Sequence, residues 1–134
     1  MLSPRPLAEA VWAAPQIAIE DLAGVAAMGV RRIVNNRPDG EEAGQPTSAE
    51  MEAAVRGAGM DYVHAPVAGM PGPDAVRAVA AALETDEPVL MYCRSGTRST
   101  VTWALAMRAL DRAEPDELRE AAANAGYDLS RLPL

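Results

Sequence analysis

The chain has 134 residues, of which 49% are hydrophobic and 23% charged, a balance typical of one globular domain and not of a disordered or membrane-embedded chain. Its 19 acidic residues outnumber its 12 basic ones, and the formal net charge of −7 argues against a partner with a nucleic-acid backbone. The single cysteine, Cys93, excludes an internal disulfide and a cysteine-based metal cluster, and with one histidine no zinc site is credible. We therefore expect a single domain over residues 1–134 in the cytoplasm, with no metal, cofactor or membrane partner.

Short apolar runs alternate with longer segments of helical periodicity, which is the pattern of strand–helix–strand units in a mainly parallel sheet. The predicted strands are residues 11–13, 32–35, 61–67 and 88–93. The predicted helices are residues 19–28, a helix from Ser48 to Gly57 or Gly59, and residues 74–83, 100–110 and 115–124. The sequence thus predicts an α/β fold with a mainly parallel sheet of about four strands, flanked by helices, and a tail 127–134 that docks on the surface.

A polar loop, Cys93-Arg-Ser-Gly-Thr-Arg-Ser99, joins the most apolar predicted strand to a predicted helix that is apolar almost all round. Open α/β sheets bind ligands at such loops, because backbone N–H groups and the positive end of the helix converge there. A cysteine in that field is favoured as the thiolate, which is the nucleophilic form. A cysteine that ends a buried strand can also be an unreactive residue that only packs in the core. Two arginines follow Cys93 closely, however, and arginines do not serve core packing. We therefore predict a reactive thiolate in an anion-binding loop.

The residue types of this loop suit separate tasks. Gly96 allows the backbone to bend so that several N–H groups face one centre. The planar guanidinium group of Arg98 can bind two oxygens of a tetrahedral anion. The side chain of Arg94 either attracts anions to the site or is simply solvated. The hydroxyl groups of Thr97 and Ser99 are candidates for hydrogen bonds to the thiolate. The predicted anion-binding loop comprises Arg94, Ser95, Gly96, Thr97, Arg98 and Ser99.

Three motifs together resemble those of a known family: Tyr92-Cys-Arg-Ser-Gly-Thr-Arg-Ser99, Thr100-Val-Thr-Trp-Ala-Leu-Ala106 and Ile33-Val-Asn-Asn-Arg-Pro-Asp-Gly-Glu41. The chain resembles the phosphatase-like domain of bacterial beta-lactamase hydrolase-like proteins over about residues 11–110. This domain family is related to dual-specificity and tyrosine phosphatases. The last helix and the tail, residues 113–134, lie outside the resemblance. The resemblance implies a cysteine-phosphatase-like fold in which Cys93 is the nucleophile and Arg98 holds the oxyanion. It also implies a small phosphate-bearing substrate that is hydrolysed through a phosphocysteine.

The same loop also resembles that of single-domain rhodaneses. Arg98 follows Cys93 by five positions, whereas cysteine phosphatases place this arginine six positions after the cysteine. This second resemblance implies a sulfurtransferase that carries sulfur from a small sulfur-bearing anion as a persulfide of Cys93. A third interpretation is a catalytically silent module that binds oxyanions or senses thiol chemistry.

A general acid would favour the phosphatase, since the expulsion of an alkoxide requires a proton donor. In dual-specificity phosphatases that acid is an aspartate on the loop after the strand matched here by residues 62–67, but this loop begins Ala68-Gly-Met70. We predict Asp39 as the catalytic acid, because it lies on another loop at the same edge of a parallel sheet. Asp39 can also be a turn-former, as it stands between proline and glycine. Arg37 on that loop is a candidate substrate contact, and His64, in mid-strand, is predicted to be structural.

Overall fold

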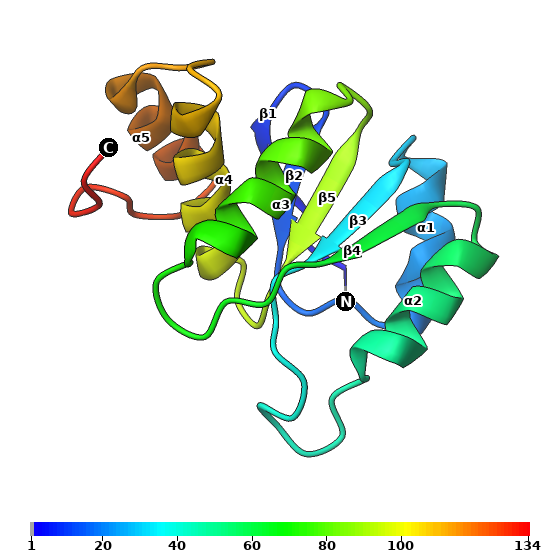
Figure 1. Ribbon diagram of the computed structural model, residues 1–134. Coiled ribbons are helices and arrows are strands. Elements are labelled where there is room, and N and C mark those ends of the chain that lie inside the picture. Colours follow the sequence, from blue (N-terminus) through cyan, green and yellow to red (C-terminus); the bar gives the residue numbers. More distant parts are fainter. Residues whose placement is uncertain (1) are drawn as a thin grey trace.

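The computed structural model describes residues 2–134, which form one five-stranded sheet with helices on both of its faces (Figure 1). The strands are β1 (Arg5–Ala8), β2 (Val11–Ala14), β3 (Arg32–Asn35), β4 (Asp61–His64) and β5 (Val89–Tyr92). The helices are the short 3-10 helix η1 (Ile19–Asp21), α1 (Leu22–Ala27), α2 (Ser48–Gly57), α3 (Pro73–Glu84), α4 (Thr97–Ala109) and α5 (Pro115–Asn124). Within these described residues, no helix is both long and apolar enough to span a membrane.

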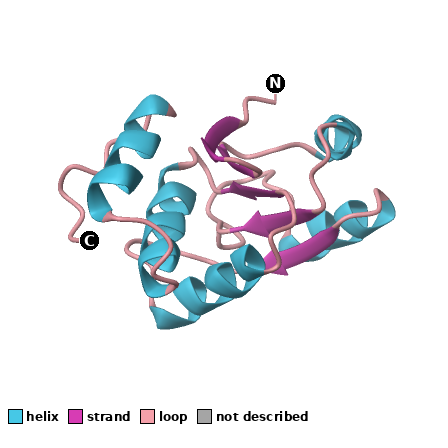
Figure 2. Cartoon of the chain, turned by 90° about the horizontal axis from the view of Figure 1, so that it is seen from above, coloured by secondary structure: helices cyan, strands magenta, loops and turns pink. Residues whose placement is uncertain are grey.

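The strand order is β1-β2-β5-β3-β4 (Figure 1), and every neighbouring pair is parallel except β1 and β2. Seen from above, the helices lie on both sides of the strands (Figure 2). The register aligns the last residues of three strands, because Asn35 of β3 pairs with both Tyr92 of β5 and His64 of β4. The loops that follow β3, β4 and β5 therefore leave the sheet at one edge. This edge contains the predicted cysteine loop.

The alternation of side chains along the central strands divides the core into two layers. Val34 and Met91 face the layer beneath α3, α4 and α5, whereas Ile33 and Leu90 face the layer beneath α1 and α2. All four residues of β5 are buried, since helices cover this strand on both faces. The uninterrupted apolar run at this position is thus explained by the central place of β5.

The four predicted strands are present and parallel, and the structure adds β1, an edge strand that the sequence analysis did not identify. Three of the four β1 residues are exposed, so its sequence lacks the apolar signal of a buried strand. A tight turn in which Ala10 has a φ of 65° returns the chain from β1 into β2. The predicted docking of the tail is confirmed, because Leu129 and Leu132 are buried in the layer beneath α4 and α5.

Two predicted boundaries differ from the structure near the candidate site. Helix α4 begins at Thr97 and not at Thr100, so part of the predicted loop already belongs to its first turn. Strand β4 ends at His64, three residues before the predicted end at Val67, which is consistent with the missing N–H of Pro66. Helix α2 begins at Ser48 as predicted, and the side chain of Thr47 accepts the capping hydrogen bond at its start.

Candidate functional site

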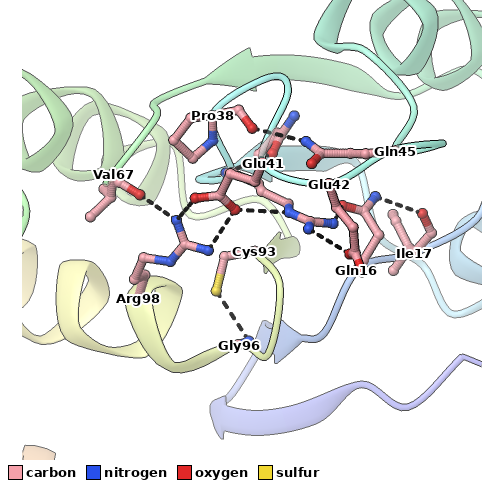
Figure 3. Close-up of polar contacts among 12 residues, drawn as sticks. Gln16, Ile17, Pro38, Glu41, Glu42, Gln45, Val67, Cys93, Gly96 and Arg98 are labelled. Carbon is pink, nitrogen blue, oxygen red and sulfur yellow. Dashed lines mark hydrogen bonds and ion pairs between the residues drawn. The ribbon is translucent and has the colours of Figure 1, made fainter. Parts of the chain in front are cut away.

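Cys93 lies directly after β5, at the amino end of α4, and its side chain and backbone have no exposed surface. The backbone N–H of Gly96 donates a hydrogen bond to Cys93 Sγ at 3.1 Å (Figure 3). An amide dipole and the positive end of a thirteen-residue helix both stabilise negative charge on that sulfur. The loop thus places the cysteine where the sequence analysis expected it, between the central strand and the amino end of a helix.

Gly96 adopts a φ of +96°, a left-handed conformation that side chains of L-amino acids rarely tolerate. A Cβ at this position would also overlap the phenol group of Tyr127, a residue of the C-terminal tail. The Tyr127 hydroxyl donates to the backbone carbonyl of Ser95 at 3.3 Å. The tail therefore supports the cysteine loop from outside, a role that sequence reasoning missed because no local pattern connects residues 32 positions apart.

Arg98 connects three loops at the carboxyl edge of the sheet. Its Nη1 donates to Glu41 Oε2 at 2.7 Å and to the carbonyl of Val67 at 2.6 Å, and its Nη2 donates to Glu41 Oε1 at 2.9 Å (Figure 3). The hydrogen bond with Glu41 is the main cause that raises the pKa of Arg98, and the nearby Cys93 sulfur acts in the same direction. Arg98 is therefore a permanent cation close to the thiol of Cys93. The two terminal nitrogens of its guanidinium group already bind the Glu41 carboxylate.

Glu41 is a residue of this site that the sequence analysis did not single out. Hydrogen bonding to Arg98, opposed by burial and assisted by Arg37, lowers the pKa of its carboxyl group to about 2. Its pairing with Arg98, 57 positions away, has no local sequence signal.

Arg37 was a candidate substrate contact, but its side chain is bound to protein groups on all sides. It donates from Nε to Glu41 at 2.9 Å, from Nη2 to Glu42 at 3.0 Å and from Nη1 to Gln16 at 3.1 Å. Burial acts to lower the pKa of Arg37, but hydrogen bonds with Glu42 and Glu41 outweigh it and raise the pKa overall. Only 2% of the Arg37 surface is exposed, and its side chain holds the loop between β3 and α2 in place through Glu41 and Glu42.

The hydroxyl groups of Ser99 and Thr97, which were candidates for hydrogen bonds to the thiolate, bind other partners in the structure. The Ser99 hydroxyl is buried and donates to Asn36 Oδ1 at 2.8 Å, because the first turn of α4 packs on the end of β3. The Thr97 hydroxyl accepts a hydrogen bond from Ser95 Oγ at 3.1 Å at the exposed rim of the loop. Arg94 is exposed at this rim, and its positive charge contributes to the lowered pKa of Glu42 after the stronger effect of the Arg37 hydrogen bond.

Asp39 lies on the loop after β3, as predicted, but its carboxylate is engaged by the start of α2. Its Oδ1 accepts a hydrogen bond from the backbone N–H of Ser48 at 2.7 Å. The sequence analysis allowed a turn-forming role for Asp39 but did not identify this contact with α2, and the catalytic role of Asp39 stays a prediction. His64 is half-buried, with Nε2 at 2.9 Å from the carbonyl oxygen of Arg37, as expected for a structural histidine.

Within residues 2–134, no three histidine, cysteine or carboxylate side chains are grouped closely enough to hold a metal ion.

Residues 4–111 match the family model for the phosphatase-like domain of beta-lactamase hydrolase-like proteins. The chain belongs to this family. It is 34% identical over 123 residues to a beta-lactamase hydrolase-like protein of Agrobacterium fabrum, a match that covers 90% of this chain and 28% of that relative. The chain thus spans little more than a quarter of the length of that family member.

Solved structures show which proteins share this fold. A candidate phosphatase from Neisseria meningitidis is 33% identical, with a TM-score of 0.77 over 94% of this chain and 90% of that chain. The kinase associated phosphatase, crystallised with serine in place of its catalytic cysteine, shares the fold with a TM-score of 0.72 at 17% identity, over 93% of this chain and 83% of that chain. The predicted fold class, an α/β domain like those of the dual-specificity phosphatases, is confirmed.

Proposed function

We propose that this domain is a cysteine-dependent hydrolase of a small phosphate ester, with Cys93 as its nucleophile. The position of the Cys93 sulfur supports this proposal best. The sulfur lies at the amino end of α4, accepts a hydrogen bond from the backbone N–H of Gly96 and lies close to Arg98. The family match and the fold shared with phosphatases favour phosphorus as the atom attacked. A reducing, cytoplasmic location suits the proposal, because the mechanism requires a free thiolate.

In the proposed reaction, the thiolate of Cys93 attacks phosphorus in line with the ester oxygen. The S–P bond forms as the P–O ester bond breaks, and the leaving oxygen takes a proton as the alcohol departs. Water then attacks the phosphocysteine, which releases inorganic phosphate and restores the thiolate. The amides of residues 94–99 and the Arg98 fork stabilise the negative oxygens of both transition states.

The proton for the leaving oxygen is assigned to Asp39, on the basis of its place at the carboxyl edge of the sheet. The loop between β4 and α3, Ala65-Pro-Val-Ala-Gly-Met-Pro-Gly72, has no carboxylate that would serve instead. For an aryl phosphate, whose leaving group is already a weak base, the demand for this proton is small.

A second candidate function is sulfur transfer, which the absence of a carboxylate from the β4–α3 loop favours. In this reaction the Cys93 thiolate attacks the outer sulfur of thiosulfate, the S–S bond breaks and sulfite leaves. A thiol acceptor then takes the outer sulfur from the Cys93 persulfide. No proton donor is needed to expel sulfite, and the short spacing from Cys93 to Arg98 suits a small sulfur-bearing anion.

Intact-protein mass spectrometry of the full chain separates these functions. The protein is exposed to an aryl phosphate or to thiosulfate and quenched in acid, with Cys93→Ser as the control. A phosphate adduct on wild-type protein that is absent from the variant supports the phosphatase. A persulfide alone overturns it in favour of the sulfurtransferase, and no adduct with either reagent indicates a silent oxyanion-binding or thiol-sensing module.

A further inference from the structure

The hydroxyl group of Tyr127 and the sulfur of Cys93 bind opposite ends of one peptide unit, the one that joins Ser95 to Gly96. Its carbonyl oxygen accepts from the Tyr127 hydroxyl at 3.3 Å, and its N–H donates to Cys93 Sγ at 3.1 Å (Figure 3). The unit is trans, so its C=O and N–H point in opposite directions. We propose that Tyr127 is a positioning residue, whose hydroxyl fixes this peptide with its N–H turned toward the sulfur and toward an anion bound there. This role rests on the proposed function, which makes the loop an anion-binding site.

The glycine makes the orientation of this peptide unit easy to reverse. Rotation of a peptide unit changes ψ of the residue before it and φ of the residue after it. Gly96 has a φ of +96°, and glycine adopts negative φ values about as readily. In the reversed orientation the carbonyl oxygen would face the Cys93 sulfur and would repel a thiolate or a bound oxyanion. A partner for the Ser95 carbonyl therefore favours the orientation that the structure shows.

The carbonyl groups on either side of Ser95 have partners of a different kind. They accept hydrogen bonds from the backbone N–H groups of Gln16 at 3.2 Å and of Thr100 at 3.0 Å. The Ser95 carbonyl between them accepts from a side chain, the Tyr127 hydroxyl. A hydrogen bond to the carbonyl also polarises the same peptide unit, so that its N–H becomes a stronger donor. Tyr127 thus acts on the one peptide of the loop that donates to Cys93.

The side chain of Tyr127 is itself held firmly. The residue is only 9% exposed, and the guanidinium group of Arg5 lies 5.9 Å from the centre of its ring. Its backbone N–H donates to the carbonyl of Ala122 at 2.8 Å, which ties the tail to the end of α5. Burial is the main cause that raises the pKa of Tyr127; Arg5 acts in the opposite direction and the nearby Cys93 in the same one. The hydroxyl therefore keeps its proton at neutral pH and can donate.

Tyr127 lies outside the part of the chain that matches the family model, since that match ends at residue 111. The cysteine and the loop that follows it lie inside the match. The chain thus supports its cysteine loop with a side chain from a segment that the family model does not include.

The variant Tyr127→Phe, made in the full chain, tests this role, because it removes the hydroxyl and leaves the ring packed against Gly96. The backbone amide of Gly96 is followed by proton–nitrogen NMR, which measures its chemical shift and its rate of exchange with solvent. The affinity for inorganic phosphate is measured by calorimetry. The matched control is Tyr62→Phe, which removes a phenol hydroxyl that binds Asn35 and Ser48 in the layer beneath α1 and α2.

We expect Tyr127→Phe to shift the Gly96 amide resonance, to accelerate its exchange and to weaken phosphate binding about threefold to tenfold, the range of one hydrogen bond. Tyr62→Phe should leave the Gly96 amide and the phosphate affinity as they are in wild-type protein. A Gly96 amide that exchanges at the wild-type rate in Tyr127→Phe overturns the proposal, since Tyr127 would then support the loop only by the packing of its ring.

The amide measurement requires no reaction, so it separates this role from the proposed function. Faster exchange at Gly96 and weaker phosphate binding in Tyr127→Phe support the role of Tyr127 even if no phosphocysteine is ever trapped, and that result contradicts only the phosphatase. A trapped phosphocysteine together with an unperturbed Gly96 amide in Tyr127→Phe contradicts only the role of Tyr127.

Discussion

The Tyr127 phenol packs directly against Gly96, so the C-terminal tail closes the outer side of the loop that begins at Cys93. Its hydroxyl donates to the carbonyl of Ser95, one residue before the glycine. On the far side of the ring, Arg5 of β1 lies 5.9 Å from the ring centre and donates to the carbonyl of Ala125. Strand β1 therefore contacts the start of the C-terminal tail next to the candidate site.

Gly96→Ala should lower the free energy of unfolding by about 1–3 kcal/mol, because alanine is strained at a positive φ and its Cβ would displace Tyr127. The amide that donates to Cys93 would move with the backbone, so phosphocysteine formation should also fall. Urea unfolding and the trapping assay measure the two effects. Gly69→Ala is the control: Gly69 is not in the left-handed region and its Cβ would meet nothing within 4 Å. Equal stability of the two variants would contradict this account.

Ser99→Ala should destabilise the protein by about 1–3 kcal/mol, since it leaves the buried Oδ1 of Asn36 without its donor. Asn36 in turn donates from Nδ2 to the carbonyl of Ala65 at 2.8 Å, so this contact joins α4 to the ends of β3 and β4. The matched variant is Ser95→Ala, which removes an exposed hydroxyl and should cost less than about 0.5 kcal/mol. Chemical denaturation of both variants tests the difference, and a cost for Ser99→Ala no larger than that of the control would refute it.

Stability should depend on pH through Glu41. The Arg98 hydrogen bond holds its pKa at about 2, below the usual 4.5. A carboxyl group whose pKa is lower in the folded state stabilises that state above the unfolded pKa, and this contribution is lost as the pH falls. The stability difference between wild type and Glu41→Gln should thus be greatest above pH 4.5 and should shrink toward pH 2. Urea unfolding across this range measures it, and a difference that stays constant with pH would argue against the ion pair.

Asp39→Asn should act more strongly on poor leaving groups than on good ones if Asp39 is the catalytic acid. We expect a loss of about 100-fold or more in kcat with an alkyl phosphate, and a much smaller loss with p-nitrophenyl phosphate, whose leaving group is a weak base. The hydrogen bond from the Ser48 N–H would be weaker to an amide oxygen than to a carboxylate, and this effect would instead act on both substrates alike. Steady-state kinetics with the two substrates distinguish these roles, and equal losses would assign Asp39 to capping alone.

The sequence by itself determined the features that rest on local patterns. The apolar run of β5 predicted a central strand, and the polar residues after it predicted a loop between strand and helix, which places Cys93 and Gly96 correctly. Apolar burial and turn chemistry act over a few residues, so they can be read along the chain. The edge strand β1 was missed because, with most of its residues exposed, it carries little of that signal.

Only the tertiary structure decided which groups surround the thiol. The parallel pairing of β3 with β5 brings the loop that contains Arg37 and Glu41 next to the first turn of α4. Ser99 turns to Asn36 and not to the thiolate because that same pairing places a buried amide oxygen within its reach. Partners of this kind are separated by more than 50 residues, and their choice depends on strand order and register, which no local pattern encodes.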